Sequence, residues 1–185
     1  FQLSCKTMAL TGFPLAFLIF AQAPPIIGFL YARHFNESVL PLQIMAFCLL
    51  FTYLYSTTQA ALDASHNEAR STIVWLVATV ANIAVDVVVI PRYGYVGSSV
   101  ATLISEMIVF AGGYVVLRRR LGLGMQTGLL LRIGGVAALT ALVSTQIKLH
   151  LIVIGVLAAL LYPALAVASG LLSRQDLKTM LAKGE

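Results

Sequence analysis

Charge is scarce in this sequence: 10% of the 185 residues are charged, whereas 59% are hydrophobic. A soluble domain carries about 25% charged residues, so the composition excludes an ordinary soluble fold. A membrane-spanning helix needs about 20 mostly apolar residues, and this length accommodates about six of them with short loops. The composition therefore predicts an all-α integral membrane protein.

Patterns that indicate soluble catalytic chemistry are also missing. There are two cysteines, and Cys48 lies inside an apolar run, which favours neither a disulfide framework nor a metal site. The Gly122-Leu123-Gly124 pattern follows no predicted strand, so it is not a nucleotide signature. We find no Gly-rich phosphate loop and no Ser-His-Asp arrangement, and we expect no enzyme activity, cofactor or metal.

The net charge of +5 does not indicate a nucleic-acid partner, because the basic residues are scattered between apolar runs. Cations beside membrane spans are the ordinary explanation. The sequence begins with Phe1, and no cationic segment with a small-residue cleavage site follows. We therefore expect this to be the later part of a longer protein.

Uncharged runs and short polar loops divide the chain. The predicted spans are residues 8–32, 39–62, 73–90, 96–117, 129–147 and 149–172, followed by a polar tail at 173–185. With six spans, nine Lys and Arg residues share the side of both termini and three lie on the other side. This bias places both ends of the chain in the cytoplasm.

The first predicted span contains Pro14 and the pair Pro24-Pro25, with Gln22 beside the pair. Proline removes a backbone donor and clashes with the preceding turn, so this span should be kinked or broken. Two interpretations stay open. Gln22 is either a polar contact between helices at a packing kink or part of a flexible gating helix.

Residues 82–106 form a predicted hairpin of two spans that holds most of the intramembrane charge. Counted inward from Pro91 and Gly97, Asn82 and Glu106 each lie about 14 Å deep, close to the midplane. The same counting places two further polar residues at about 8 Å, namely Asp86 and Thr102.

Helical spacing gathers polar residues on one face of each arm of this hairpin. The two stripes are Thr79, Asn82 and Asp86, and Ser99, Thr102 and Glu106. In a structural interpretation, neutral Glu106 bonds to Asn82 and locks the hairpin. In a functional one, the acids border a polar cavity and bind a cation, a proton or a headgroup, as intramembrane acids commonly do.

The predicted turn has its own chemistry. Pro91 ends one helix, whereas Gly94 and Gly97 permit a tight backbone and close packing. Arg92 faces the outer side, where it either pairs with an anionic lipid or phosphate or is a solvated loop cation.

The stretch IPRYGYVGSSVATLISE resembles a signature of the polysaccharide and oligosaccharide flippases, in the multidrug/oligosaccharidyl-lipid/polysaccharide exporter superfamily. The matching residues are Asn82, Ile90 to Gly94, Gly97, Ala101-Thr102 and Ser105-Glu106. Asp86 departs from the pattern, in which a second Asn is common, and Ser98-Ser99 replace the usual alanines. The resemblance covers most of the chain and is strongest over residues 39–120.

The resemblance implies the carboxy-terminal lobe of a two-lobed transporter, whose amino-terminal lobe is its missing partner. It implies alternating-access transport of lipid-linked oligosaccharide or polysaccharide precursors across the membrane, for the building of the cell envelope. Membrane lipids would be its other partners. Three alternatives remain: a multidrug cation antiporter of the same superfamily, a membrane-embedded enzyme acting on lipid-linked sugars, and a scaffold that transports nothing.

Overall fold

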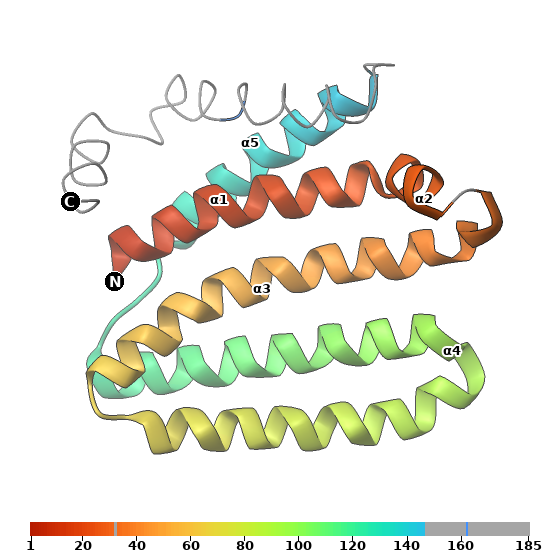
Figure 1. Cartoon of the computed structure of the whole chain (residues 1–185). Coiled ribbons are helices and arrows are strands. Elements are labelled where there is room, and N and C mark those ends of the chain that lie inside the picture. The colour runs from red at the N-terminus through yellow and green to blue at the C-terminus, as the bar shows by residue number, and fades with distance from the viewer. Residues whose placement is uncertain (32, 147–161, 163–185) are drawn as a thin grey trace.

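The computed structural model describes residues 1–31, 33–146 and 162. These residues form helices α1 (Gln2–Ala21), α2 (Ala23–Tyr31), η1 (Arg33–Ser38), α3 (Val39–Ala64), α4 (Glu68–Leu121) and α5 (Thr127–Gln146) (Figure 1). Strands are absent from this described part. The expected sixth span and the polar tail, apart from Tyr162, lie outside the described residues.

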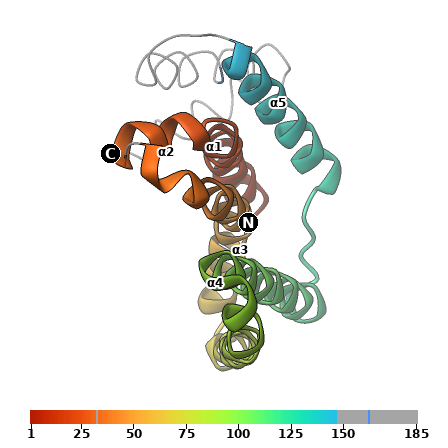
Figure 2. The same ribbon diagram turned by 90° about the vertical axis from the view of Figure 1, so that its right-hand side faces the viewer.

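The long helices lie roughly antiparallel, side by side (Figures 1 and 2). α1 packs between α5 and α3, and α3 packs on α4. One hydrophobic core joins α1, α3 and α5 through residues that include Phe13, Leu54 and Ile133. A second, smaller core joins α3 to α4 through Tyr55, Ala78 and Val109.

Large hydrophobic side chains cover much of the outside. Val87 is 70% exposed, and its neighbours Val80, Ile83 and Val88 are each more than half exposed. Within the described residues, four helices are long and apolar enough to cross a membrane. Such an apolar surface is stable in contact with lipid. The chain is therefore an all-α integral membrane protein, as the composition predicts.

The first apolar run is interrupted at Gln22, between α1 and α2. Gln22 has φ −99° and ψ 10°, and the next helix begins at Ala23, just before Pro24-Pro25. Pro14 lies inside α1 without ending it. The break therefore falls at the proline pair, where two consecutive backbone donors are missing.

α4 is a hairpin rather than one rod, although 54 residues run through it (Figure 1). The chain reverses at Gly94, whose φ of 54° and ψ of −133° favour glycine. Below, the first arm means residues 68–93 and the second arm residues 95–121. The arms touch where glycines leave room: a Cβ on Gly97 would lie 2.9 Å from the Val89 carbonyl oxygen, and one on Gly112 would lie 2.7 Å from the Val74 side chain.

These two contacts define the register of the arms. Seven residues inward from the Gly97–Val89 contact, Asn82 lies level with Ile104, and Glu106 lies level with Val80. The expectation that Asn82 and Glu106 share one level is therefore wrong by two residues, or about 3 Å. The reason is that the bare backbone of Gly97 packs against Val89, two residues before Pro91, so the turn is not symmetric about its proline.

We predict that Gly97→Ala destabilises the protein by about 1–3 kcal/mol, because the added methyl group meets backbone atoms of Val89 that cannot rotate away. Gly28→Ala in α2 is the matched control, since its methyl group would enter open space. That substitution should leave stability unchanged or raise it by up to about 1 kcal/mol through helix propensity. Thermal unfolding in detergent measures both; equal midpoints would contradict the close packing of the arms.

Candidate functional site

Glu106, halfway along the second arm, makes its hydrogen bond across a helix interface. The Thr52 hydroxyl of α3 lies 3.1 Å from Glu106 Oε2 and can donate to it, in place of the Cys48 carbonyl oxygen of its own helix at 3.0 Å. Thr52 lies in the middle of the 26-residue α3. The Thr52 hydroxyl and the Glu106 carboxylate therefore both lie near mid-depth of the apolar helices. The structure therefore directs Glu106 toward α3, not toward Asn82 as the structural interpretation proposed.

Thr52 belongs to a polar stripe on α3 that the sequence analysis missed. The stripe consists of Thr52, Ser56, Gln59 and Asp63, at helical positions i, i+4, i+7 and i+11. The signal was present in the sequence, because these are regularly spaced polar residues in an otherwise apolar run. Polar spacing was followed only along the hairpin around residues 82–106, so the stripe on α3 was overlooked.

The end of this stripe is tied to α4. The Gln59 amide donates to Asp63 Oδ1 at 2.8 Å, and its carbonyl oxygen accepts from the Ser71 and Tyr55 hydroxyls. Tyr55 and Ser71 also lie 3.0 Å apart, and the Tyr55 ring packs edge-on against Trp75. These bonds satisfy polar groups that would otherwise be costly to bury, and they join α3 to the first arm.

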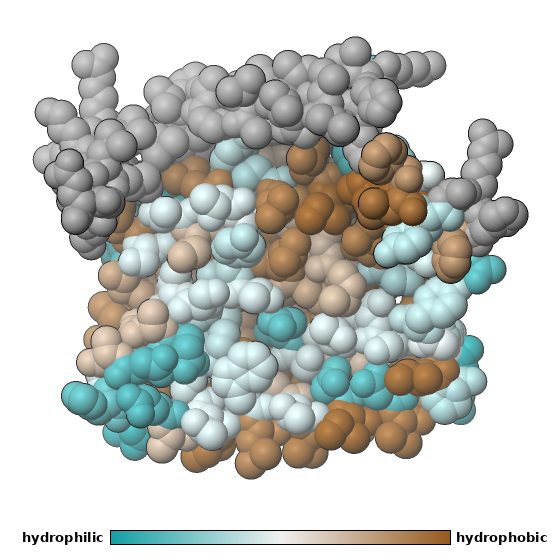
Figure 3. Space-filling view, in the orientation of Figure 1, coloured by the Kyte–Doolittle hydropathy of each residue, from teal (hydrophilic) through white to brown (hydrophobic). Residues whose placement is uncertain are grey.

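On the face shown in Figure 3, hydrophilic and weakly hydrophobic residues form a band across the middle, with strongly hydrophobic residues above it and along the lower edge, on the first arm. A hollow of about 370 Å³ lies between α1 and α3, lined by residues that include Ser4, Ser56 and Thr57. Ser56 is exposed, and its hydroxyl donates to the Thr52 carbonyl oxygen at 2.6 Å. We call the stripe on α3, with Glu106 beside it, the polar wall.

The first-arm residues are placed differently. Asn82 and Asp86 are both partly buried. The Asp86 Oδ1 atom is inaccessible to solvent and has no hydrogen-bond partner among the described residues. Thr102 donates to the Ser98 carbonyl oxygen of its own helix at 3.0 Å. The two predicted stripes therefore form no bond to each other. Among the acids of the described part, Asp86 alone has a buried carboxylate oxygen without a hydrogen-bond partner.

Gln22 and Arg92 lie apart from the polar wall. Gln22 is 5% exposed and its amide donates to Ser144 Oγ of α5 at 3.0 Å, which is the geometry of a polar contact between helices. Arg92 is exposed beside the Gly94 turn. In the same turn, the Tyr95 hydroxyl donates to the Glu37 carboxylate of η1. This bond holds the turn against the η1 segment that joins α2 to α3.

The chemistry of the wall is that of polar recognition. It offers two carboxylates, Asp63 and Glu106, two hydroxyls and one amide. Within the described residues there is no group of three His, Cys, Asp or Glu residues placed to hold a metal ion. Carboxylates and hydroxyls within apolar helices are typical of a substrate or ion pathway.

Comparison with known proteins gives a family match over nearly the whole chain. The model of the family described as "Lipid II flippase MurJ" matches residues 1–169. The chain is also 34% identical, over 107 residues, to an uncharacterized membrane protein of Methanocaldococcus jannaschii. That match covers 57% of this chain and 25% of the relative's length. No solved structure matches.

We predict that Thr52 and Glu106 are energetically coupled by about 1 kcal/mol, a typical value for a hydrogen bond between membrane helices. Thr52→Val and Glu106→Met each remove one partner, and the double variant should be less destabilised than the two single effects together. Thr140→Val, in α5, is the control because its hydroxyl bonds within its own helix at 2.8 Å. Unfolding free energies that are additive for Thr52 and Glu106 would contradict the bond.

Proposed function

The chain belongs to the lipid II flippase MurJ family, and from this membership we propose that it is one lobe of a flippase for lipid-linked oligosaccharide or polysaccharide precursors. The family is one of flippases rather than enzymes, which argues against the membrane-embedded enzyme. The protein would carry its substrate across the cytoplasmic membrane by alternating access, without covalent chemistry.

The polar wall is the observation that carries this proposal. Thr52 and Glu106 lie at mid-depth of apolar helices, where a polar surface needs water, substrate or another polar surface against it. A lipid-linked saccharide has a polar headgroup that must cross the membrane centre. The two hydroxyls, the amide and the two carboxylates of the wall give that headgroup hydrogen-bonding partners along the path.

We further propose that this chain supplies the carboxy-terminal lobe, with an amino-terminal lobe facing the polar wall. One lobe encloses a cavity on one side only, and the chain spans about a quarter of the length of the curated relative that it matches. In this arrangement the six expected spans, of which residues 149–172 would be the last, form half of a cavity wall.

Charge placement supports an orientation. Arg70 and the cluster Arg118-Arg119-Arg120 lie at the same end of the helices as the amino terminus, and Arg92 lies at the opposite end (Figure 1). The positive-inside rule then places the arginine-rich end in the cytoplasm, and with six spans both ends of the chain would be there.

The cation antiporter remains the second candidate, because Asp86 and Glu106 are both acids within the apolar hairpin. It requires an acid that takes up a cation directly. Glu106 bonds to Thr52, whereas Asp86 has an unpaired oxygen, so Asp86 is the better candidate for a coupling ion. The family match favours the flippase.

We predict that Glu106→Gln in the full-length protein slows the flipping of lipid-linked saccharide in reconstituted vesicles by about tenfold, the effect of about 1.4 kcal/mol. Glutamine can still accept the bond from Thr52, so the variant isolates the loss of the carboxylate charge. Glu68→Gln, at the exposed start of α4, is the matched control and should transport normally. Undiminished transport by Glu106→Gln would remove this carboxylate from the mechanism.

A second prediction concerns the lobe itself. The 185-residue chain alone, reconstituted into vesicles, should not flip lipid-linked saccharide, because one lobe cannot form a cavity with two walls. Adding the amino-terminal lobe as a separate polypeptide should restore transport. Activity from the 185 residues alone would overturn the two-lobe proposal and leave the family assignment intact.

A further inference from the structure

An apolar groove of about 700 Å³ lies between α5 and the second arm of α4, on the side of the molecule where α5 stands away from the hairpin (Figure 2). Aromatic rings form much of its lining: Phe13 and Phe17 from α1, and Phe110 and Tyr114 from the second arm. Phe110 and Tyr114 stack with their centroids 6.3 Å apart. The groove belongs to neither the polar wall nor the hollow between α1 and α3.

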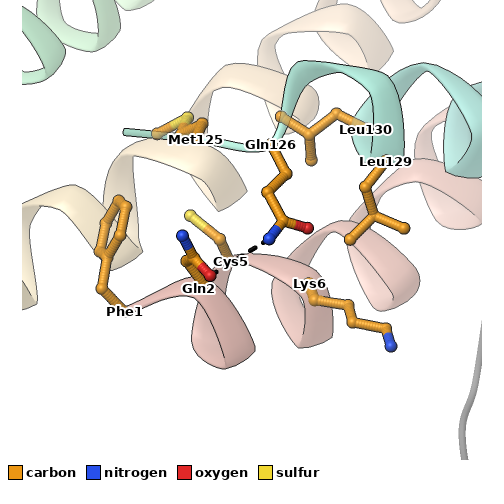
Figure 4. Close-up of a pocket in the computed structure, with 8 residues that line it drawn as sticks. All are labelled: Phe1, Gln2, Cys5, Lys6, Met125, Gln126, Leu129 and Leu130. Atoms are coloured by element: carbon orange, nitrogen blue, oxygen red, sulfur yellow. Dashed lines mark hydrogen bonds between the residues drawn. The ribbon is translucent and has the colours of Figure 1, made fainter. Parts of the chain in front are cut away.

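The groove exists because α5 starts beside α1 and not beside the second arm. Residues 122–126 form a non-helical link after the left-handed Gly122. The Gln126 amide then donates to Gln2 Oε1 of α1 at 3.1 Å (Figure 4). The pocket at this corner holds only about 10 Å³, about one water. The corner is therefore closed, and the groove is not a channel through it.

The length of the groove matches one leaflet of a bilayer. Its lining residues on α5 run from Thr127 to Ala138, which at 1.5 Å per residue is about 16 Å. Half of the hydrocarbon core is about 15 Å. The groove therefore has the length of a single acyl chain that stays within one leaflet.

Positive charge lies at one end of the groove. Phe110, Tyr114 and Arg118 are spaced four residues apart on the second arm, so they follow one face of the helix. The two rings line the groove, and Arg118 is exposed one turn beyond Tyr114, with Arg119 and Arg120 next to it. A chain lying on the rings would place its headgroup beside Arg118, where a phosphate would be favoured.

We propose that this groove binds one acyl chain of an anionic bilayer phospholipid, from the leaflet at the arginine-rich end, with the lipid phosphate beside Arg118. The bound chain fills the space between α5 and the second arm and so sets their separation. Tyr162, the described residue of the expected sixth span, packs in the core of α1 and α5 and does not line the groove. The proposal does not depend on which substrate the protein moves.

Two glycines of α5 give a matched test. A side chain at Gly135 would enter open space in the groove, whereas Gly128 has equally open space but does not line the groove. The full-length protein and its Gly135→Leu and Gly128→Leu variants are purified from nanodiscs of equal parts phosphatidylglycerol and phosphatidylcholine. Retained lipid is counted by native mass spectrometry. Gly135→Leu should retain about tenfold less phosphatidylglycerol, equivalent to about 1.4 kcal/mol, and Gly128→Leu as much as the parent.

The charge is tested with a second pair. Arg118→Gln should reduce the preference for phosphatidylglycerol over phosphatidylcholine by about fivefold, as expected for one cation at the membrane surface. Arg70→Gln, exposed at the start of the first arm, should leave that preference unchanged. Equal lipid retention by Gly135→Leu and Gly128→Leu, or an unaltered preference in Arg118→Gln, would overturn the proposal.

A photo-crosslinking residue at position 135 identifies the occupant directly, even if the leucine variants fold poorly. Crosslinks to phosphatidylglycerol support the proposal. Crosslinks to residues 149–172, to a second copy of the protein or to an isoprenoid-linked saccharide in place of phospholipid would each overturn it. Because transport is not measured here, a negative result leaves the proposed flippase function standing.

Discussion

A carboxyl group at the middle of a membrane needs a hydrogen-bond donor, and much of this structure follows from how Glu106 obtains one. Thr52 on α3 supplies the bond, which requires the second arm to lie against α3. Gly113 permits that approach, because a Cβ there would lie 2.8 Å from the Tyr55 ring. The first arm packs on the second through Gly97 and Gly112, and it meets α3 near its own start, where the Ser71 and Tyr55 hydroxyls lie 3.0 Å apart. The packing of the two arms on α3 and on each other is thus compatible with one partly buried acid and three glycine backbones without side chains.

Several other hydroxyl groups in the helices are satisfied without a neighbouring helix. Thr102, Thr140 and Ser56 each donate to a carbonyl oxygen four residues earlier in their own helix, a bond that needs no neighbouring helix. Gln22 and Glu106 have longer side chains and bond across interfaces instead. Among the described residues, each hydrogen bond between two helices therefore constrains the position of one helix relative to the other. A hydrogen bond within one helix places no such constraint on its neighbours.

Much of this arrangement could be predicted from the sequence. Apolar runs and proline positions indicated the all-helical class, the interruption beside Gln22 and a reversal of the chain near Gly94. The partner of Glu106 could not be predicted, because it depends on which face of α3 meets the second arm. Helical spacing assigns residues to faces but does not say which faces touch. The register of the hairpin could not be predicted either, because the contact between Gly97 and Val89 decides which residues of the two arms lie at the same level. The separation of α5 from the hairpin depends on the five-residue link and the Gln126–Gln2 bond, neither of which has a periodic signal.

The hairpin has a consequence for how the protein enters the membrane. A lone helix that carries Asn82 and Asp86 is costly to leave in lipid, since one aspartate at the centre of a span costs about 2.5–3.5 kcal/mol in translocon-based insertion scales. The reversal at Gly94 places a second helix directly behind the first in the order of synthesis. The two glycine contacts let that helix cover the first along its length. We therefore expect the arms to leave the translocon as a pair, so that the turn contributes to biogenesis as well as to the finished fold.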